Sequence, residues 1–222
     1  MESRLNRDNT EGRLVRTMLT KEEWDILVGS LLGDGCLRIM GRSKVPAFSV
    51  SHGENQKAYV FWKYEKLKRW VNTPPWREER VYHRDKSRKT FSWRFQTLSN
   101  SVFSNLYNTF YKKGKKIVPD NIERLLKKAP LALTLWLMDD GNKNHQAVFL
   151  NTQSFSLSQQ QKLCQALHKV FGFHVTLNRH SKSKGVQLYR IRIDTKSTQK
   201  LKSIVEGYIL PQFSYKLPDF SL

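Results

Sequence analysis

The sequence predicts an α+β protein built from two similar halves, and three observations predict it. Two apolar segments each end in an Asp-Gly step, namely 27–35 (LVGSLLGDG) and 133–141 (LTLWLMDDG). The same order of expected helices and strands follows each segment, and FSWRFQTLS at 91–99 aligns with YRIRIDTKS at 189–197 without a gap. A lysine just before a proline segment recurs at a similar distance after each Asp. An internal duplication is the simplest account of all three.

The first half is expected to begin with a helix. Thr20-Lys-Glu-Glu23 has the form of a capping box, and the helix that it opens runs to Gly35. Its last two turns are apolar or small on every side, which predicts a helix buried all round, and Gly29 and Gly33 would let another backbone approach closely. The elements expected after it are a strand at 48–51, a helix near 58–70, strands at 80–83 and 91–97, a helix near 101–111, and Lys116-Ile-Val-Pro119.

The second half repeats this order from Pro130, a residue favoured in the first turn of a helix. The elements expected in it are an apolar helix to Asp139, a strand at 147–151, a helix opened by Ser158 and Gln161 and closed by Gly172, strands at 174–178 and 189–195, a last helix, and Lys216-Leu-Pro218. The two apolar helices can then bury each other. The predicted division is a flexible basic tail at 1–19, a first half at 20–119, a linker at 120–129 and a second half at 130–222.

Composition indicates a polyanionic partner. The 222 residues hold 39 Lys and Arg against 19 Asp and Glu, a net charge of +20 that is spread along the chain. The longest apolar run, near 131–138, is far short of the roughly 18 residues that a membrane span needs. The two cysteines, Cys36 and Cys164, lie far apart, which predicts neither a disulfide framework nor a cysteine-rich zinc site. We therefore expect an intracellular nucleic-acid-binding protein with no membrane partner.

Asp34 and Asp140 stand where an acid is least favoured, at the carboxyl end of an apolar helix. The unsatisfied carbonyls of a helix C-terminus carry partial negative charge, so an acid there needs a compensating cation. A single Asp-Gly after a helix is usually only a helix stop and a turn. Two duplicated ends, brought together, would instead make a site for a divalent cation.

At these residues the chain resembles the LAGLIDADG homing endonucleases of the single-chain, two-motif type, and is similar to the yeast mitochondrial intron-encoded group. Further similar segments are WVNTPP at 70–75, LNTQSF at 150–155 and YILPQFSYKLP at 208–218. The resemblance implies two pseudo-symmetric αββαββα halves, with the motif helices packed at the interface and the antiparallel sheets forming a DNA-binding saddle. It marks Asp34 and Asp140 as metal ligands. The departures from the family pattern are Ser30, Leu135, Trp136 and the second acid Asp139. Leu135 stands where the first motif has Gly29.

The metal expected at this site is Mg²⁺, with Mn²⁺ or Ca²⁺ able to replace it for binding. Phosphodiester hydrolysis needs an activated water, a stabilised phosphorane-like charge and an assisted leaving oxygen, and bound Mg²⁺ can serve all three. Mg²⁺ prefers oxygen ligands and commonly takes one or two carboxylates. The expected ligands are Asp34 and Asp140, with the backbone carbonyls of Gly33 and Asp139.

Three further side chains are candidates for catalysis. Lys116 and Lys216 occupy equivalent places in the repeat, and we expect them to reach the two scissile phosphates as electrostatic stabilisers or as partners of the attacking water. Without the repeat, both would be interpreted as solvated surface lysines. Asn178, at the end of an expected strand, is a weaker candidate for positioning that water.

Alternating strands supply candidates for reading bases. Phe91, Trp93 and Phe95 share one face of their strand, and Arg94 and Gln96 share the other. Arg, Gln and Asn can pair with guanine or adenine edges in a major groove wide enough for a β-ribbon. The candidate readers are Arg38, Arg42, Arg80, Arg84, Lys86, Arg88, Arg94, Gln96, Lys143, Asn151, Gln153, Arg179, Lys182, Gln187, Arg190 and Arg192.

These features predict a monomeric, Mg²⁺-dependent DNA endonuclease, a phosphodiester hydrolase that cuts both strands of a long, asymmetric double-stranded site. The resemblance implies 3′ overhangs, a role in intron mobility and a mitochondrial or chloroplast location. One alternative is an intron RNA maturase, a splicing cofactor with the same fold that does not cleave DNA. Another is a DNA-binding regulator with vestigial motifs. The intact Asp34 and Asp140 favour the enzyme over both.

Overall fold

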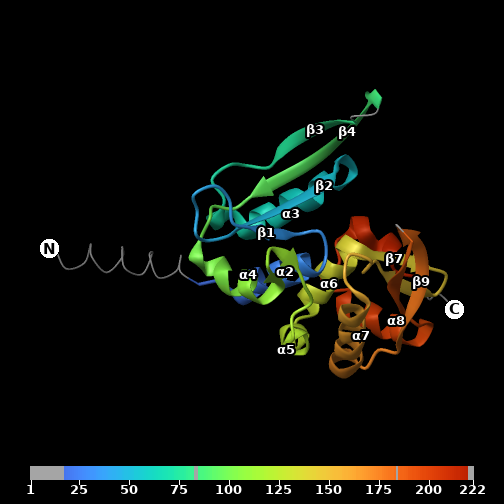
Figure 1. Ribbon diagram of the computed structural model, residues 1–222. Helices are drawn as coiled ribbons and strands as arrows, with labels where there is room; N and C mark the ends of the chain where they lie inside the picture. Colours follow the sequence, from blue (N-terminus) through green and yellow to red (C-terminus); the bar gives the residue numbers. More distant parts are fainter. Residues whose placement is uncertain (1–17, 83–84, 184, 220–222) are drawn as a thin grey trace, which may run out of the picture. The chain divides into compact units, whose positions relative to one another are not determined.

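A computed structural model describes residues 18–82, 85–183 and 185–219 (Figure 1). Most of the expected basic tail at 1–19 lies outside these residues. The elements up to residue 116 are α2 (Lys21–Leu32), β1 (Cys36–Arg38), β2 (Ala47–Gly53), α3 (Lys57–Leu67), β3 (Trp76–Tyr82), β4 (Asp85–Gln96), α4 (Ser104–Phe110), β5 (Tyr111–Lys112) and β6 (Lys115–Lys116). Short 3-10 turns at Glu54–Gln56, Lys68–Trp70 and Ser101–Phe103 join some of them.

The later elements follow the same order. They are α5 (Ile122–Leu126), α6 (Pro130–Asp140), β7 (Gly141–Asn144), β8 (Ala147–Leu150), α7 (Leu157–Phe171), β9 (Val175–Ser183), β10 (Val186–Ile193), α8 (Thr195–Val205) and a 3-10 turn at Pro211–Lys216. The predicted α+β class and the αββαββα order of each half are confirmed. The expected linker at 120–129 contains α5, whose Leu125 and Leu126 are buried.

Two antiparallel sheets share one strand order. The first runs β1-β2-β4-β3 and the second β7-β8-β10-β9. In each sheet a short strand that directly follows a motif helix lies at one edge, and the central pair joins strands far apart in sequence. The common order is what a duplicated ancestor would produce.

The chain divides into two compact units. One contains the described residues up to Trp24 together with Gly35–Asn108, and the other contains Asp25–Asp34 together with 109–222. The last turns of α2 therefore belong to the same unit as α6 and the second sheet. The division into repeat halves at 20–119 and 130–222 stays a prediction about the ancestry of the chain.

The core of the first unit lies between α3 and one face of its sheet. The ring of Trp93 in β4 meets Phe61 of α3 at 5.4 Å, and Phe95 meets Tyr64 at 6.0 Å, both edge to face. Phe95 is fully buried. This confirms the predicted inward face of the strand and leaves the face of Arg94 on the side away from α3.

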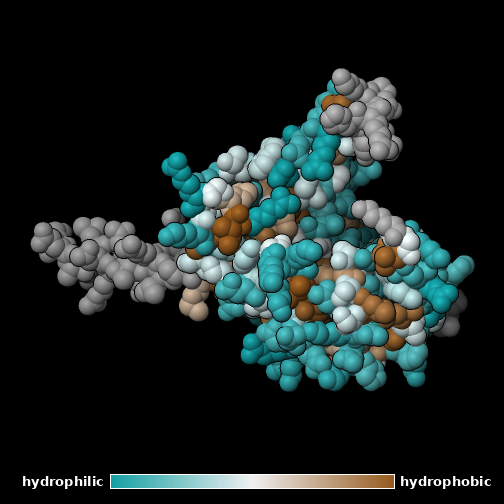
Figure 2. Space-filling model, in the orientation of Figure 1, coloured by the Kyte–Doolittle hydropathy of each residue, from teal (hydrophilic) through white to brown (hydrophobic). Residues whose placement is uncertain are grey.

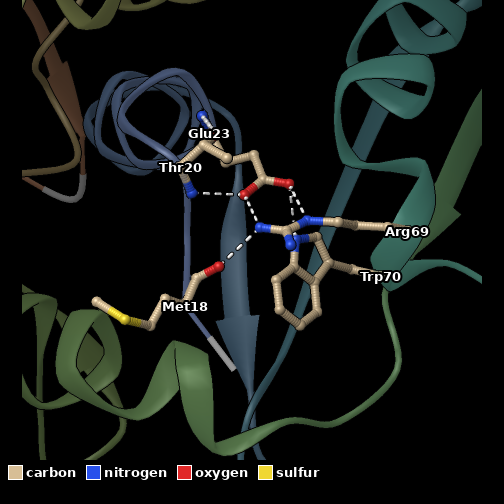
Figure 3. A network of polar contacts seen from close by, with 5 residues as sticks. All are labelled: Met18, Thr20, Glu23, Arg69 and Trp70. Carbon is tan, nitrogen blue, oxygen red and sulfur yellow. Dashed lines mark hydrogen bonds and ion pairs between the residues drawn. The ribbon is translucent and has the colours of Figure 1, made fainter. Parts of the chain in front are cut away.

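A polar network anchors the start of α2 within the same unit (Figure 3). The Thr20 amide donates to Glu23 Oε2 at 2.8 Å, and the Glu23 amide donates to Thr20 Oγ1 at 3.2 Å, which confirms the predicted capping box. Arg69 donates to both carboxylate oxygens of Glu23 at 2.7 and 2.6 Å, and to the Met18 carbonyl. The Trp70 indole donates to Glu23 Oε1 at 3.0 Å.

The second unit is built around α6. Its residues from Leu131 to Met138 are all buried, as the apolar run predicts. Amphipathic α7 packs against α5 and against the second sheet, and the surface over α5 and α7 is hydrophilic (Figure 2). Of the helices in the part of the chain that the structure describes, none has the length and apolarity to cross a membrane.

The start of α7 differs from the prediction. The capping box is Ser156 with Gln159, two residues before the expected Ser158 and Gln161. Both pairs have the same spacing, but Ser156 has the extended backbone that an N-cap needs and its side chain accepts from the Gln159 amide. The helix does end at Gly172, whose φ of 66° lies in the left-handed region.

Candidate metal and phosphate site

The two motif helices pack backbone to backbone in the second unit. A Cβ placed on Gly29 of α2 would lie 2.3 Å from the Ala132 carbonyl oxygen and 2.6 Å from Leu135 Cβ in α6. Only glycine fits in so little space. Leu135, one of the departures from the motif, therefore faces Gly29, and the helices approach closely because one of the two equivalent positions has no side chain.

This packing brings Asp34 and Asp140 to one cavity of about 480 Å³. The Asp34 residue is exposed, since it lies just past the end of α2, whereas Asp140 is the last residue of α6 and is half-buried. The cavity is lined by Gly33, Asp34, Lys116, Asp140, Asn151, Gln153, Ser154 and Phe155. The two predicted acids thus come together as expected from the duplication.

Asp139 joins the two helix ends. Its Oδ2 accepts a hydrogen bond from the Asp34 amide at 3.2 Å. A Cβ on Gly33 would lie 2.5 Å from Asp139 Cβ and 2.7 Å from its Oδ2, so this carboxylate lies directly against the glycine. Asp139 and Gly33 hold equivalent positions in the two motifs. Because Gly33 has no side chain, the first motif cannot offer the same hydrogen bond to the second.

The two predicted lysines lie differently. Lys116 is half-buried, lines the cavity and donates from Nζ to the Gly33 carbonyl at 2.9 Å. Lys216 is only 5% exposed, and its Nζ donates to the carbonyls of Met138 at 2.5 Å and Asp139 at 3.2 Å. An ammonium group at a helix C-terminus complements the helix dipole. The carbonyls of Gly33 and Asp139, predicted as metal ligands, thus each accept a hydrogen bond from a lysine.

Acidic groups crowd the cavity. Burial, together with the nearby charges of Asp34 and Asp139, raises the pKa of Asp140 to about 7, against the opposing effect of Lys116 and Lys216. A carboxyl group with so high a pKa has too little positive charge near it to stabilise its ionised form. A divalent cation would supply that charge, and the surrounding donors are the carboxylate and carbonyl oxygens that Mg²⁺ prefers.

The cavity also includes residues that the sequence analysis placed elsewhere. Asn151 and Gln153 were predicted to read bases, but they line the cavity, where Gln153 donates to Asn151 at 3.5 Å and Asn151 donates to Asn142 at 3.1 Å. Ser154 and Phe155 were not predicted as site residues. The signal that could have found them is the segment 150–155, which follows β8 and already belonged to the family resemblance.

Asn178 lies in β9, opposite Arg190, and its Oδ1 accepts from the Thr176 hydroxyl at 3.0 Å. It is not among the described residues that line the cavity. Its role in positioning water stays a prediction.

The first sheet places several predicted base readers on one face. Strand register puts Arg38, Arg80, Arg94 and Gln96 on the face away from α3. Arg42 lies in the exposed turn between β1 and β2. Arg84 lies outside the described residues, and nothing is described of the side chains of Lys86 and Arg88.

The second sheet separates its predicted readers. Arg190 and Arg192 of β10 share a face with Asn178 and Thr176 of β9, and the Arg190 guanidinium lies 3.8 Å from the centre of the Phe149 ring. Arg179 pairs with Tyr189, whereas Lys143 pairs with Val148, and both pairings place them on the other face. The reading of bases by these two residues stays a prediction. Lys182 and Gln187 pair with each other near the end of the hairpin.

The sequence and the fold of the chain match those of known proteins. The profile of the LAGLIDADG DNA endonuclease family matches residues 24–201. The chain is 29% identical over 214 residues to DNA endonuclease I-ChuI of Chlamydomonas applanata, covering 90% of this chain and 96% of that protein. It is 27% identical over 205 residues to cytochrome b mRNA maturase bI2 of Debaryomyces hansenii, covering 91% and 76%. The solved structure of homing endonuclease I-WcaI bound to its DNA recognition sequence superposes with a TM-score of 0.81 at 26% identity, covering 93% and 89%.

Proposed function

We propose that this chain, which belongs to the LAGLIDADG DNA endonuclease family, is a site-specific homing endonuclease. It hydrolyses both strands of a long, asymmetric DNA site. One observation carries the proposal: Asp34 and Asp140, from the ends of two duplicated helices, line one cavity with Lys116. Two carboxylates and an ammonium group around a half-buried hollow are the groups that metal-assisted phosphodiester hydrolysis uses.

The residues of the cavity fit Mg²⁺. Asp34 and Asp140 would hold the ion, with the carbonyls of Gly33 and Asp139 beside them, and phosphate and water complete the shell. When bound, the ion lowers the pKa of a coordinated water and stabilises charge on the phosphate. Its charge also offsets the repulsion that raises the pKa of Asp140. Mn²⁺ or Ca²⁺ takes its place for DNA binding.

The lysines have separate roles. Lys116, held by the Gly33 carbonyl, faces the cavity and stabilises the negative charge that develops on the scissile phosphate. Lys216 holds the last carbonyls of α6 and thereby fixes the main chain that carries Asp140. Its direct action on the second scissile phosphate, and the action of Asn178 on the attacking water, stay predictions.

DNA recognition is assigned to the polar faces of the two sheets. A strand of eight residues rises about 27 Å, which matches roughly eight base pairs, so that both sheets together read about sixteen pairs. The two halves differ in sequence, which favours an asymmetric site and a monomeric enzyme. The family resemblance adds 3′ overhangs, intron mobility and an organellar location, which the likeness to a cytochrome b mRNA maturase supports.

A second candidate function is RNA maturase activity. The relative from Debaryomyces hansenii is named as a maturase and covers 91% of this chain. Maturase activity would use the same fold with intron RNA as the partner and would not require DNA cleavage.

The test incubates the purified chain and Mg²⁺ with DNA in which the two exons flanking a candidate host intron are joined. We expect a double-strand break at one position near the exon junction, and none without a divalent cation. A parallel assay adds the chain to the precursor RNA. Stimulated splicing with intact DNA would instead establish the maturase and overturn the nuclease.

A further inference from the structure

An acidic side chain lies on a sheet face that is proposed to meet a polyanion. Glu78 of β3 pairs with Ser92 of β4, and by strand alternation it shares a face with Arg94, which pairs with Trp76. This is the face away from α3. A carboxylate there repels phosphates, so its presence on this face needs a specific reason.

Glu78 holds two of the predicted base readers. Arg94 Nη1 donates to Glu78 Oε1 at 2.9 Å, and Arg80 Nη2 lies 3.6 Å from Glu78 Oε2. The Arg94 guanidinium also lies 5.3 Å from the centre of the Trp76 ring. The Arg94 and Glu78 side chains are 23% and 31% exposed, so they are ordered by their neighbours yet can still be reached from solvent.

The pair retains unused hydrogen-bonding capacity. Arg94 Nε and Glu78 Oε2 are buried, and neither makes a hydrogen bond to any residue that the structure describes. The contact of Oε2 with Arg80 is too long for a hydrogen bond. The folded chain thus leaves part of the hydrogen-bonding capacity of the pair unused, and the two partly exposed side chains can take an acceptor for the arginine and a donor for the carboxylate from a ligand.

A G·C base pair supplies both groups on one edge. In the major groove guanine presents the O6 and N7 acceptors that suit arginine, and cytosine presents an N4 amine that suits a carboxylate. In an A·T pair the adenine N6 amine also suits a carboxylate, but adenine presents N7 alone as an acceptor, so the arginine would lose the bidentate contact that guanine O6 and N7 provide. We propose that Glu78 and Arg94 act as one unit that selects a single G·C pair in the DNA target; this rests on the proposed function.

The alternative interpretation of the same contact is purely structural: a cross-strand ion pair that stabilises the β3–β4 hairpin. The two interpretations predict different results. A structural pair affects stability when it is removed and leaves the base preference unchanged, whereas a reading unit changes the preference at one position.

The chain offers a matched control for this distinction. Glu79, the next residue of β3, makes a more exposed ion pair with Lys89 at 2.7 Å. Its register partner is Phe91, so it lies on the opposite face from Glu78. Glu79→Ala removes a carboxylate and an ion pair from the same hairpin without touching the proposed reading unit.

The experiment selects bound sequences from a randomised double-stranded library, in Ca²⁺, with the full chain and with Glu78→Ala, Arg94→Ala, the double variant and Glu79→Ala. We expect the wild-type chain to enrich G·C at one position, and Glu78→Ala and Arg94→Ala each to lower that preference by about tenfold. The double variant should lose little more than either single variant, because the two residues act together. Glu79→Ala should keep the wild-type preference.

Two results would overturn the proposal. In the first, Glu78→Ala lowers the melting temperature but retains every base preference. In the second, Glu78→Ala and Arg94→Ala alter different positions. Because the selection uses binding alone, a chain that selects a sequence but never cuts DNA would contradict the proposed nuclease and leave this inference standing.

Discussion

At the scale of single residues, the most consequential feature is the unequal pair Gly33 and Asp139. The duplication makes them equivalent in sequence, yet Gly33 has no side chain. The Asp139 carboxylate lies against Gly33 and accepts a hydrogen bond from the Asp34 amide. The hydrogen bond links the main chain of one proposed metal ligand to the residue beside the other. We infer that it fixes the spacing between Asp34 and Asp140.

Substitution of Asp139 tests this hydrogen bond. Asp139→Ala removes the acceptor, and we expect about 10- to 100-fold slower single-turnover cleavage, because small displacements of reacting groups have effects of this size. Asp139→Asn keeps an acceptor oxygen and should cleave near the wild-type rate. Hydrogen exchange at the Asp34 amide should be faster in Asp139→Ala alone. If the Asn variant is as slow as the Ala variant, the charge of Asp139 matters and its hydrogen bond does not.

Glu23 predicts a specific loss of stability in acid. Burial raises the pKa of its carboxyl group, but hydrogen bonds from Arg69, Thr20 and Trp70 outweigh burial and lower the pKa below 4.5. A lowered pKa means that the ionised form stabilises the fold above the unfolded-state pKa, and that this contribution is lost as the pH falls through the folded-state pKa.

Urea unfolding at pH 7 and at pH 3 measures this effect. Glu23→Gln should lower the free energy of unfolding at pH 7 by about 1.5–3 kcal/mol, because hydrogen bonds to charged groups contribute about that much, and by less at pH 3. The control is Glu22→Gln, which removes an exposed ion pair with Lys66. Surface pairs of that kind contribute about 0–1 kcal/mol. Equal losses at both pH values in Glu23→Gln would show that its ionisation is not the source of the stability.

At the scale of elements, the sequence predicts the motif helices well because their pattern is long and specific. The apolar turns of α2 and α6, the capping box at Thr20 and the helix end at Gly172 follow from local chemistry. The edge strands β1 and β7 were not among the strands read from the residues, since three or four residues are too few to show alternation.

Parts of the candidate site depend on tertiary contacts that no local pattern encodes. The duplication predicts that Asp34 and Asp140 meet. It also predicts equivalent lysines, but Lys116 lines the cavity and Lys216 is buried against the end of α6. The placement of Asn151 in the cavity depends on the path of the chain after β8.

Helix packing yields a prediction at Gly29. Its Cβ position is 2.3 Å from a backbone oxygen, which cannot turn aside as a flexible side chain would. Gly29→Ala should therefore lower the free energy of unfolding by about 1–3 kcal/mol, the usual cost of overpacking. Gly53→Ala is the control, since its backbone is extended and its Cβ would meet nothing within 4 Å. Equal stability of both variants in urea unfolding would contradict the close approach of α2 and α6.

At the scale of the whole molecule, the net charge of +20 predicts how DNA affinity responds to salt. Binding to a long duplex displaces counterions from the phosphates, and a protein with 6–10 phosphate contacts loses about 10³–10⁵ in affinity between 50 and 200 mM salt. We expect a loss in this range when binding is measured by fluorescence anisotropy in Ca²⁺. A loss below about tenfold would contradict an extended phosphate interface.

The central claim is that Asp34 and Asp140 form one catalytic metal site. The most direct measurement is the single-turnover cleavage rate of each DNA strand by Asp34→Asn and Asp140→Asn in Mg²⁺, with DNA binding measured separately in Ca²⁺. We predict that each variant binds DNA with near wild-type affinity and cuts neither strand detectably. Wild-type cleavage of both strands by both variants would contradict the account.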